Sequence, residues 1–181
     1  MKYKICKDTN PIMRKTSNDV ILPISKEDKE TLDFMLTYLR KSQDENYARK
    51  HNIQAGVGIA GIQLGLLKRM FAIYYEREDG TIVQYQLVNP KIIESSLKMA
   101  ALEGGEGCLS VENRHEGLVH RHLSIKMEAF DALTNKNIII NASGYDAIVL
   151  QHEFDHLNGV FYYDHIDTKN PFTPYKGEEI I

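Results

Sequence analysis

The apolar residues near the N-terminal end of the chain recur at the spacing of an α-helix. Between residues 25 and 50, four large apolar side chains share one helical face: Leu32, Met35, Leu36 and Leu39. Ser25 stands before this pattern and Asp28 follows three residues later, as in a capping box, so the helix is predicted to begin at Ser25. The polar and charged stretch 43–52 indicates the solvated end of this helix or a surface loop.

Shorter apolar runs in the middle of the chain predict β-strands. Strands are expected at residues 69–75, 81–88, 91–95, 124–130 and 137–141. Asp79–Gly80 provides a turn between the first two strands, and the third follows Pro90. The stretch 56–65 reads GVGIAGIQLG, and its four glycines predict a tight backbone path rather than a helix.

A second helix is predicted from Ser143 to about residue 157. Ser143 can cap its start, with Asp146 three residues further on. Asn158–Gly159 is a stop signal, because glycine readily adopts the left-handed conformation that ends a helix. The tail beyond this helix is expected to be irregular. Two main helices combined with antiparallel strands make this an α+β protein.

The composition is that of a globular protein, with 43% hydrophobic and 26% charged residues, and predicts one domain spanning residues 1–181. A net charge of −3 with scattered Lys and Arg argues against direct nucleic-acid binding. No apolar run is long enough to span a membrane, and Met1–Asn10 has no stretch typical of a signal peptide, which predicts a cytoplasmic protein. No disulfide is expected between Cys6 and Cys108, and Cys6 is interpreted as a packing residue.

The sharpest local pattern is His-Glu-x-x-His at residues 152–156, inside the predicted second helix. Residues four apart lie on the same face of a helix, so His152 and His156 can present two imidazoles to one metal ion. Glu153 can then reach a water activated by that ion and take its proton, as in metal-dependent hydrolases. The predicted architecture is therefore antiparallel strands packed around a central metal-binding helix, with an N-terminal helix.

The third ligand of a catalytic site of this kind is not settled by the motif. One large protease class has a third His at the position of Tyr162, and another takes a Glu from a following helix. Here the only later glutamates are Glu178 and Glu179, in the tail. A general metalloendopeptidase remains an alternative, although its third ligand is missing. So does a binding protein with a structural metal, for which Asp155 and His165 are the nearest candidates for a closing ligand.

Cys108 lies upstream in a glycine-rich segment, Gly105-Glu106-Gly107-Cys108-Leu109-Ser110. A thiolate is a strong metal ligand, and the neighbouring glycines allow the backbone to approach a ligand closely. Taken alone, a free cysteine is more often a small buried hydrophobic residue.

Three segments together resemble the peptide deformylase family, and they occur in the family's order. They are GVGIAGIQ at residues 56–63, EGCLS at 106–110 and QHEFDH at 151–156. A weaker likeness extends from Asn10 to about Asp167 and so covers most of the chain. The long segment before Gly56 and the stretch 116–121 are similar to the longer form of the enzyme found in many Gram-positive bacteria and their relatives.

The resemblance implies a metal-dependent hydrolase that removes the N-formyl group from the initiator methionine of nascent polypeptides and releases formate. Cys108, His152 and His156 would bind one metal, with water or hydroxide in the fourth position attacking the formyl carbon, and Glu153 would act as general base and then as general acid. The Gln63 amide and the Leu109 backbone N–H would stabilise the oxyanion. The ligand set suits Zn²⁺, while the family commonly uses Fe²⁺ and tolerates Ni²⁺ or Co²⁺.

The resemblance also implies how the substrate binds. An extended formyl-methionyl peptide would pair with backbone near Val57, Gly58 and Gly107, as an added strand does. Its first side chain would enter an apolar pocket whose family positions are occupied here by Tyr145, Ile148 and Val149. Transient proximity to the ribosome is expected, but the ribosome-docking helix of some members is not. Gly61 departs from the family, which often has Ala there, and this could affect the positioning of Gln63.

Overall fold

The computed structural model describes residues 4–181. The prediction of no signal peptide concerned Met1–Asn10, of which residues 1–3 lie outside the described part. The α-helices are α1 (Lys26–Ser42), α2 (Glu45–His51) and α3 (Tyr145–His156), with 3₁₀ turns η1 (Pro11–Arg14), η2 (Gly61–Leu64) and η3 (Tyr162–His165). The strands are β1 (Gly58–Ala60), β2 (Met70–Glu76), β3 (Ile82–Ser95), β4 (Met99–Ala101), β5 (Arg121–His122), β6 (Ser124–Asp131), β7 (Lys136–Ser143) and β8 (Glu179–Ile180).

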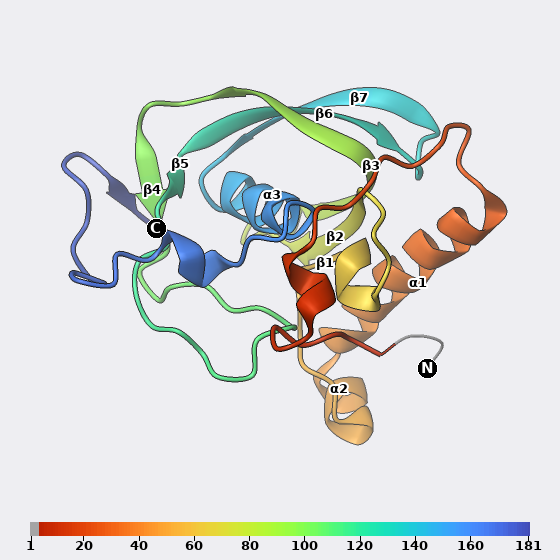
Figure 1. Cartoon of the computed structure of the whole chain (residues 1–181), viewed down its shortest axis with the longest axis horizontal. Helices are drawn as coiled ribbons and strands as arrows, with labels where there is room; N and C mark the ends of the chain where they lie inside the picture. Colours follow the sequence, from red (N-terminus) through yellow and green to blue (C-terminus); the bar gives the residue numbers. More distant parts are fainter. Residues whose placement is uncertain (1–3) are drawn as a thin grey trace.

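Two sheets enclose the central helix. The larger one is antiparallel, with strand order β1-β2-β3-β6-β7, and the smaller has the order β5-β4-β8. In Figure 1, β3, β6 and β7 arch over α3, while α1 lies outside the sheet and packs against β2. The predicted α+β architecture around a central helix is confirmed, whereas a single domain over 1–181 stays a prediction.

The N-terminal helix begins as predicted, because the Ser25 side chain accepts a hydrogen bond from the Asp28 N–H. It ends earlier than residue 50: α1 stops at Ser42, and Asp44 caps the separate helix α2. The prediction that 43–52 is merely solvated was wrong for Gln43. Its Nε2 donates to the backbone oxygens of Gly56 and Tyr74, at 2.9 and 2.6 Å.

The two strands predicted on either side of Pro90 form one strand, β3. The register with β6 shifts between Val88 and Lys91, so Pro90 lies at a bulge, where the missing N–H costs no ladder bond. Asn89 adopts φ 51° there, and its side chain bonds the backbone N–H and C=O of Val20. A proline thus bends this strand instead of ending it.

The cap predicted for the second helix was wrong, while its end was predicted correctly. Gly144 is the N-cap of α3 and no side chain caps it, because Ser143 still belongs to β7 and pairs with Ser124. The Asp146 carboxylate accepts a hydrogen bond from the Tyr75 hydroxyl instead. Gly159 follows the helix with φ 71°, the left-handed conformation that the stop signal requires.

The tail beyond the second helix was predicted to be irregular, and it is so only in part. β8 adds to β4 in parallel, with Ala100 opposite Glu179 and Ala101 opposite Ile180. A strand of two residues shows no periodicity in the sequence, so β8 can be recognised only from its pairing with β4. Cys6 and Cys108 are both free, as expected. Within residues 4–181, no helix has the length and apolar character needed to cross a membrane.

Candidate metal centre and active-site cavity

The helix α3 and the loop after β4 bring three potential metal ligands together. His152 and His156 lie one helical turn apart on α3, with ring centroids 5.0 Å apart. Cys108 comes from the loop, and its Sγ lies 3.2 Å from His156 Nε2. One ligand atom from each of these residues lies within 4.8 Å of the others. The structure therefore brings together the sulfur and two imidazoles that were named as ligands.

The donor chemistry of this cluster fits a divalent transition metal. Within residues 4–181, His156 Nδ1 is buried without a hydrogen-bond partner, and His152 Nδ1 faces Glu106 Oε2 at 2.7 Å. The second arrangement orients the imidazole and leaves its Nε2 available, as carboxylate–histidine pairs do in metal sites. Asp155 and His165 face each other at 2.7 Å and do not join the cluster. The closing ligand of a purely structural site is therefore not supplied by the two candidates.

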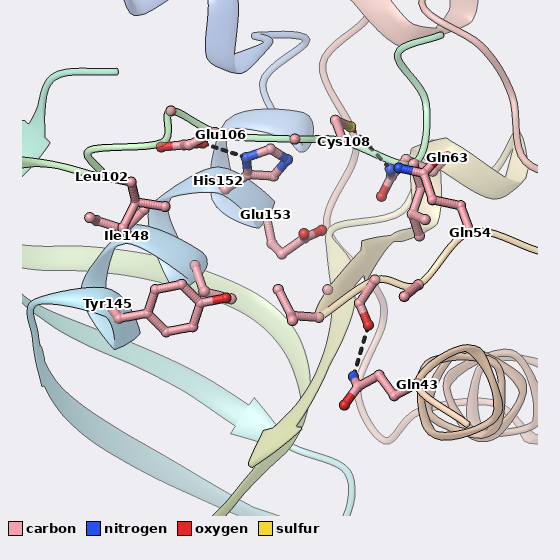
Figure 2. Close-up of a pocket in the computed structure, with 18 residues that line it drawn as sticks. Gln43, Gln54, Gln63, Leu102, Glu106, Cys108, Tyr145, Ile148, His152 and Glu153 are labelled. Carbon is pink, nitrogen blue, oxygen red and sulfur yellow. Dashed lines mark hydrogen bonds and ion pairs between the residues drawn. The ribbon is translucent and has the colours of Figure 1, made fainter. Parts of the chain in front are cut away.

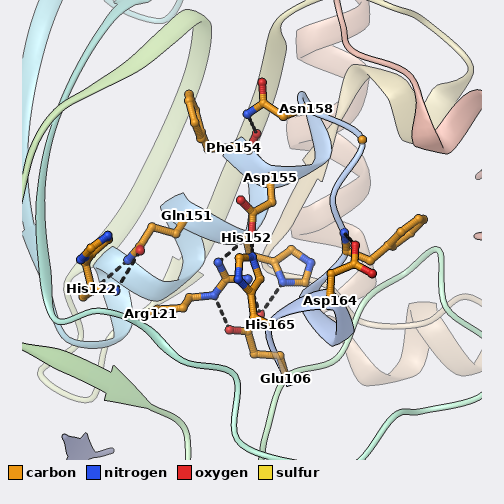
Figure 3. A network of polar contacts seen from close by, with 12 residues as sticks. Glu106, Arg121, His122, Gln151, His152, Phe154, Asp155, Asn158, Asp164 and His165 are labelled. Carbon is orange, nitrogen blue, oxygen red and sulfur yellow. Dashed lines mark hydrogen bonds and ion pairs between the residues drawn. The ribbon is translucent and has the colours of Figure 1, made fainter. Parts of the chain in front are cut away.

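A buried polar network contacts His152, one of the three candidate ligands, on the side away from the cluster (Figure 3). Arg121 forms hydrogen-bonded ion pairs with both Glu106 and Asp155, and its side chain is 2% exposed. Burial opposes ionisation of Glu106, but the charge of Arg121 and the contact with His152 outweigh it and hold its pKa at about 2. Gln151 exchanges two hydrogen bonds with the His122 backbone and so holds β5, which carries Arg121, against α3.

The carboxylate of Glu153 is buried at the cavity, and one of its oxygens lacks a hydrogen-bond partner among the described residues. The residue is 3% exposed, and Oε2 has no hydrogen-bond partner within residues 4–181. Burial raises its pKa to about 7. Gly58 of β1 packs directly against it: a Cβ on Gly58 would lie 2.3 Å from Glu153 Oε1 and 2.6 Å from its carboxyl carbon. Glycine at position 58 is what leaves room for the carboxylate.

Gly58→Ala is expected to displace Glu153 and, for the formylated peptides that the sequence resemblance implies as substrates, to lower kcat/KM by about 10²-fold, the scale of a mispositioned catalytic group. Gly104→Ala is the matched control, because a Cβ there meets nothing within 4 Å. Steady-state kinetics and metal analysis of both variants check this. Equal activity of Gly58→Ala and Gly104→Ala would show that the close packing does not matter.

Gln63 lies beside the three candidate ligands, and hydrogen bonds hold both ends of its side-chain amide. Its Oε1 accepts from the Ala60 N–H at 2.7 Å, and its Nε2 lies 3.1 Å from Ser110 Oγ and 3.6 Å from Cys108 Sγ. Gly61 does not loosen this arrangement. A Cβ at Gly61 would lie 2.9 Å from the Lys68 carbonyl oxygen, so the tight path through η2 itself calls for glycine.

A cavity of about 350 Å³ opens beside this cluster (Figure 2). Eleven of the twelve site residues named from the sequence line it: Val57, Gly58, Gln63, Gly107, Cys108, Leu109, Tyr145, Ile148, Val149, His152 and Glu153. The twelfth, His156, is 1% exposed beneath it. Figure 2 shows Leu102 beside Ile148, above the Tyr145 ring.

Further residues of the site were missed by sequence reasoning. Leu102 and Gln43 line the cavity, and Glu106 and Arg121 form the supporting network. Glu106 stands two positions before Cys108 in a motif already singled out, which was a usable signal. No signal in the sequence indicated Leu102 or Gln43, because they reach the cavity only when segments distant in sequence pack together.

The structure combines two imidazoles and a thiol that are able to hold a metal ion with a buried glutamate at a cavity, and this combination is typical of a metal-dependent hydrolase. The family model described as polypeptide deformylase matches residues 2–172. The chain belongs to the peptide deformylase family, as the three sequence motifs predicted.

Relatives and solved structures agree with this assignment. A peptide deformylase of Oceanobacillus iheyensis is 44% identical over 168 residues, which are 93% of this chain and 91% of the relative. Peptide deformylase 2 of Bacillus subtilis is 42% identical over the same shares of both chains. A probable peptide deformylase from Synechococcus phage S-SSM7 superposes with a TM-score of 0.73 at 30% identity, covering 91% of this chain and 99% of the other. The chain is thus a metal-dependent deformylase, and the metalloendopeptidase alternative finds no support.

Proposed function

We propose that this protein removes the formyl group from the initiator methionine of nascent polypeptides and releases formate, with Cys108, His152 and His156 holding its metal. The observation that carries the proposal is the buried carboxylate of Glu153 beside these three residues at the cavity, whose Oε2 has no hydrogen-bond partner in the described part of the chain. A carboxylate held without a partner needs one from a ligand, because burying it otherwise costs free energy.

Each polar group at the cluster has a role in amide hydrolysis. When bound, the divalent ion polarises the formyl carbonyl and makes water acidic enough to be deprotonated near neutral pH. Glu153 takes the proton from the attacking water and returns it to the departing amine. The Gln63 Nε2 and the Leu109 N–H donate hydrogen bonds to the oxygen that becomes negatively charged.

We propose Fe²⁺ as the metal in the cell, with Zn²⁺, Ni²⁺ or Co²⁺ able to replace it. One sulfur and two nitrogens are ligands that suit all four ions. Elemental analysis of protein purified without oxygen decides between them. Iron at about one equivalent per chain supports the proposal, and zinc alone at that level, with full activity, contradicts it.

The backbone beside the cavity suits an extended peptide. Val57, Gly58 and Gly107 line it, and a Cβ at Gly107 would meet nothing within 4 Å, so there is room there for a substrate main chain. Backbone pairing of this kind recognises the peptide main chain and depends little on the side chains, which suits an enzyme acting on many proteins. A peptide deformylase of Acinetobacter baumannii that is 26% identical has been crystallised with Met-Ala-Ser bound.

The apolar part of the cavity would accept the methionine side chain. Changing its size therefore tests the substrate assignment. Ile148 and Val149 of α3 are both buried at its wall. Val149→Trp is expected to fill the pocket and lower kcat/KM for formyl-Met-Ala-Ser by at least about 10²-fold, with a smaller loss for formyl-Ala-Ala-Ser. Val149→Ile is the size-graded control, and thermal unfolding verifies the fold of both. An unchanged Met-to-Ala preference in Val149→Trp would place the pocket elsewhere.

One assay tests the activity as a whole. The purified, metal-loaded protein is offered formyl-Met-Ala-Ser, acetyl-Met-Ala-Ser and a peptide with an unblocked N-terminus. Formate release from the first substrate alone supports the proposal. Cleavage of an internal peptide bond would contradict it, as would the absence of turnover with every metal.

The site of action follows from the substrate. We propose that the protein works in the cytoplasm on chains emerging from the ribosome, with transient proximity and no direct contact with nucleic acid. The net charge of −3 supports the last point, since binding to a phosphate backbone needs a basic surface. Co-sedimentation with ribosomes at physiological salt tests it, and a stable nuclease-sensitive complex would contradict it.

A further inference from the structure

The segment 173–181, which we name the tail segment, lies beyond the part of the chain that the family model matches. It nevertheless reaches the wall of the active-site cavity. The Ile181 N–H donates to the Ala101 carbonyl at 3.0 Å, and the Glu103 N–H donates to the Ile181 carbonyl at 2.8 Å. Ile181 therefore binds the residues on either side of Leu102, whose side chain lines the cavity.

The tail segment is also anchored from its own side. Glu178 faces His120 Nδ1 at 2.8 Å, and the two side chains are 0% and 3% exposed. The Tyr175 ring stacks on the His120 ring with centroids 3.7 Å apart. A buried hydrogen-bonded pair and a stacked ring fix the direction in which the last residues run along β4. These contacts, together with the pairing of β8 with β4, hold the tail segment in place although both β8 residues are exposed.

A further contact links the tail segment to the start of α3, which lies on the same side of the pocket as Leu102. A Cβ built at Gly144 would lie 3.7 Å from Ile181 Cδ1, so the Ile181 side chain lies against the N-cap of α3. The next residue, Tyr145, lines the same cavity as Leu102. In Figure 2 these two side chains flank Ile148. Ile181 thus contacts the chain next to two residues that line the pocket. It bonds the backbone on either side of Leu102, and it lies against Gly144, which precedes Tyr145.

We propose that the tail segment is a positioning element for the methionine pocket, acting through backbone pairing that holds Leu102 in place. This inference rests on the proposed function and adds a determinant of substrate affinity to it. Leu102 lies beside Ile148, in the part of the cavity proposed for the substrate's first side chain. Its displacement is therefore expected to weaken binding equally in the ground and transition states. Such a change raises KM and leaves kcat in place.

Two variants of the tail segment test the proposal. The first lacks residues 179–181, and the second is Ile181→Pro, which removes the N–H that bonds Ala101. Both are expected to raise KM for formyl-Met-Ala-Ser about tenfold, with kcat within about twofold of wild type, as for lost uniform binding. The affinity for Met-Ala-Ser, measured by calorimetry, should fall by the same factor. The preference for formyl-Met over formyl-Ala peptides should narrow.

A matched control in the same strand leaves the backbone pairing intact. Glu179→Gln removes only an exposed ion pair with Lys98, so its KM should stay at the wild-type value. Unchanged KM and unchanged Met-to-Ala preference in the two test variants would overturn the proposal. So would parallel losses of kcat and bound metal, which would indicate general destabilisation. Wild-type protein without deformylase activity would instead contradict the proposed function.

Discussion

Replacing Glu153 by Gln is expected to lower kcat/KM for formyl-Met-Ala-Ser by about 10²–10⁴-fold, the range for loss of a general acid–base group. The substitution keeps the size of the side chain in a site where the residue is 3% exposed. An amide cannot take a proton from water or return it to the amine. Because Glu153 is not among the three residues of the ligand cluster, bound metal should stay at the wild-type level.

The measurements needed are steady-state kinetics and metal content on the same preparations. Glu128→Gln is the matched control, since that carboxylate is on β6 with a side chain 49% exposed and pairs only with surface Lys91 among the described contacts. Glu153→Ala, which leaves space for a water molecule, should also lose most of its rate. Retention of more than a tenth of the wild-type kcat/KM in Glu153→Gln would exclude this residue as the proton-transfer group.

The two candidate ligands on α3, His152 and His156, can be predicted from the sequence because a helix fixes their relative geometry. A spacing of four places His152 and His156 on one face, whatever the rest of the fold does. Cys108 has no such local constraint. Its position depends on how the loop after β4 closes over α3. Its thiol and neighbouring glycines left two interpretations open, and the family resemblance was needed to choose the metal ligand.

The parts that were missed share a physical cause. Gln43 reads as a surface residue, yet a turn of the chain brings it to two backbone carbonyls of distant segments. The bulge at Pro90 and the pairing of β8 likewise depend on partners far along the chain. Local propensity indicates where an element can form, whereas long-range pairing decides whether a break becomes a bend and whether a tail becomes a strand.

The buried network behind the metal site should dominate stability among the charged groups of the protein. Arg121→Met is expected to lower the free energy of unfolding by about 3–5 kcal/mol, as for other buried ion pairs that lose one partner. The substitution leaves Glu106 with a side chain 4% exposed and removes the cation that favours its ionised form. It also removes the partner of Asp155 and leaves His165 as that carboxylate's remaining contact in the network.

Denaturant unfolding of metal-free protein measures this effect without the contribution of a bound ion. Lys91→Met is the matched control: its ion pair with Glu128 has side chains 72% and 49% exposed, and exposed pairs contribute about 0–1 kcal/mol. A double variant, Arg121→Met with Glu106→Gln, should recover part of the lost stability, because position 106 then no longer carries a buried charge that has lost its cation. If Arg121→Met cost no more than Lys91→Met, the network would not be a stabilising support. Its contact with His152 would then have to be explained by metal binding alone.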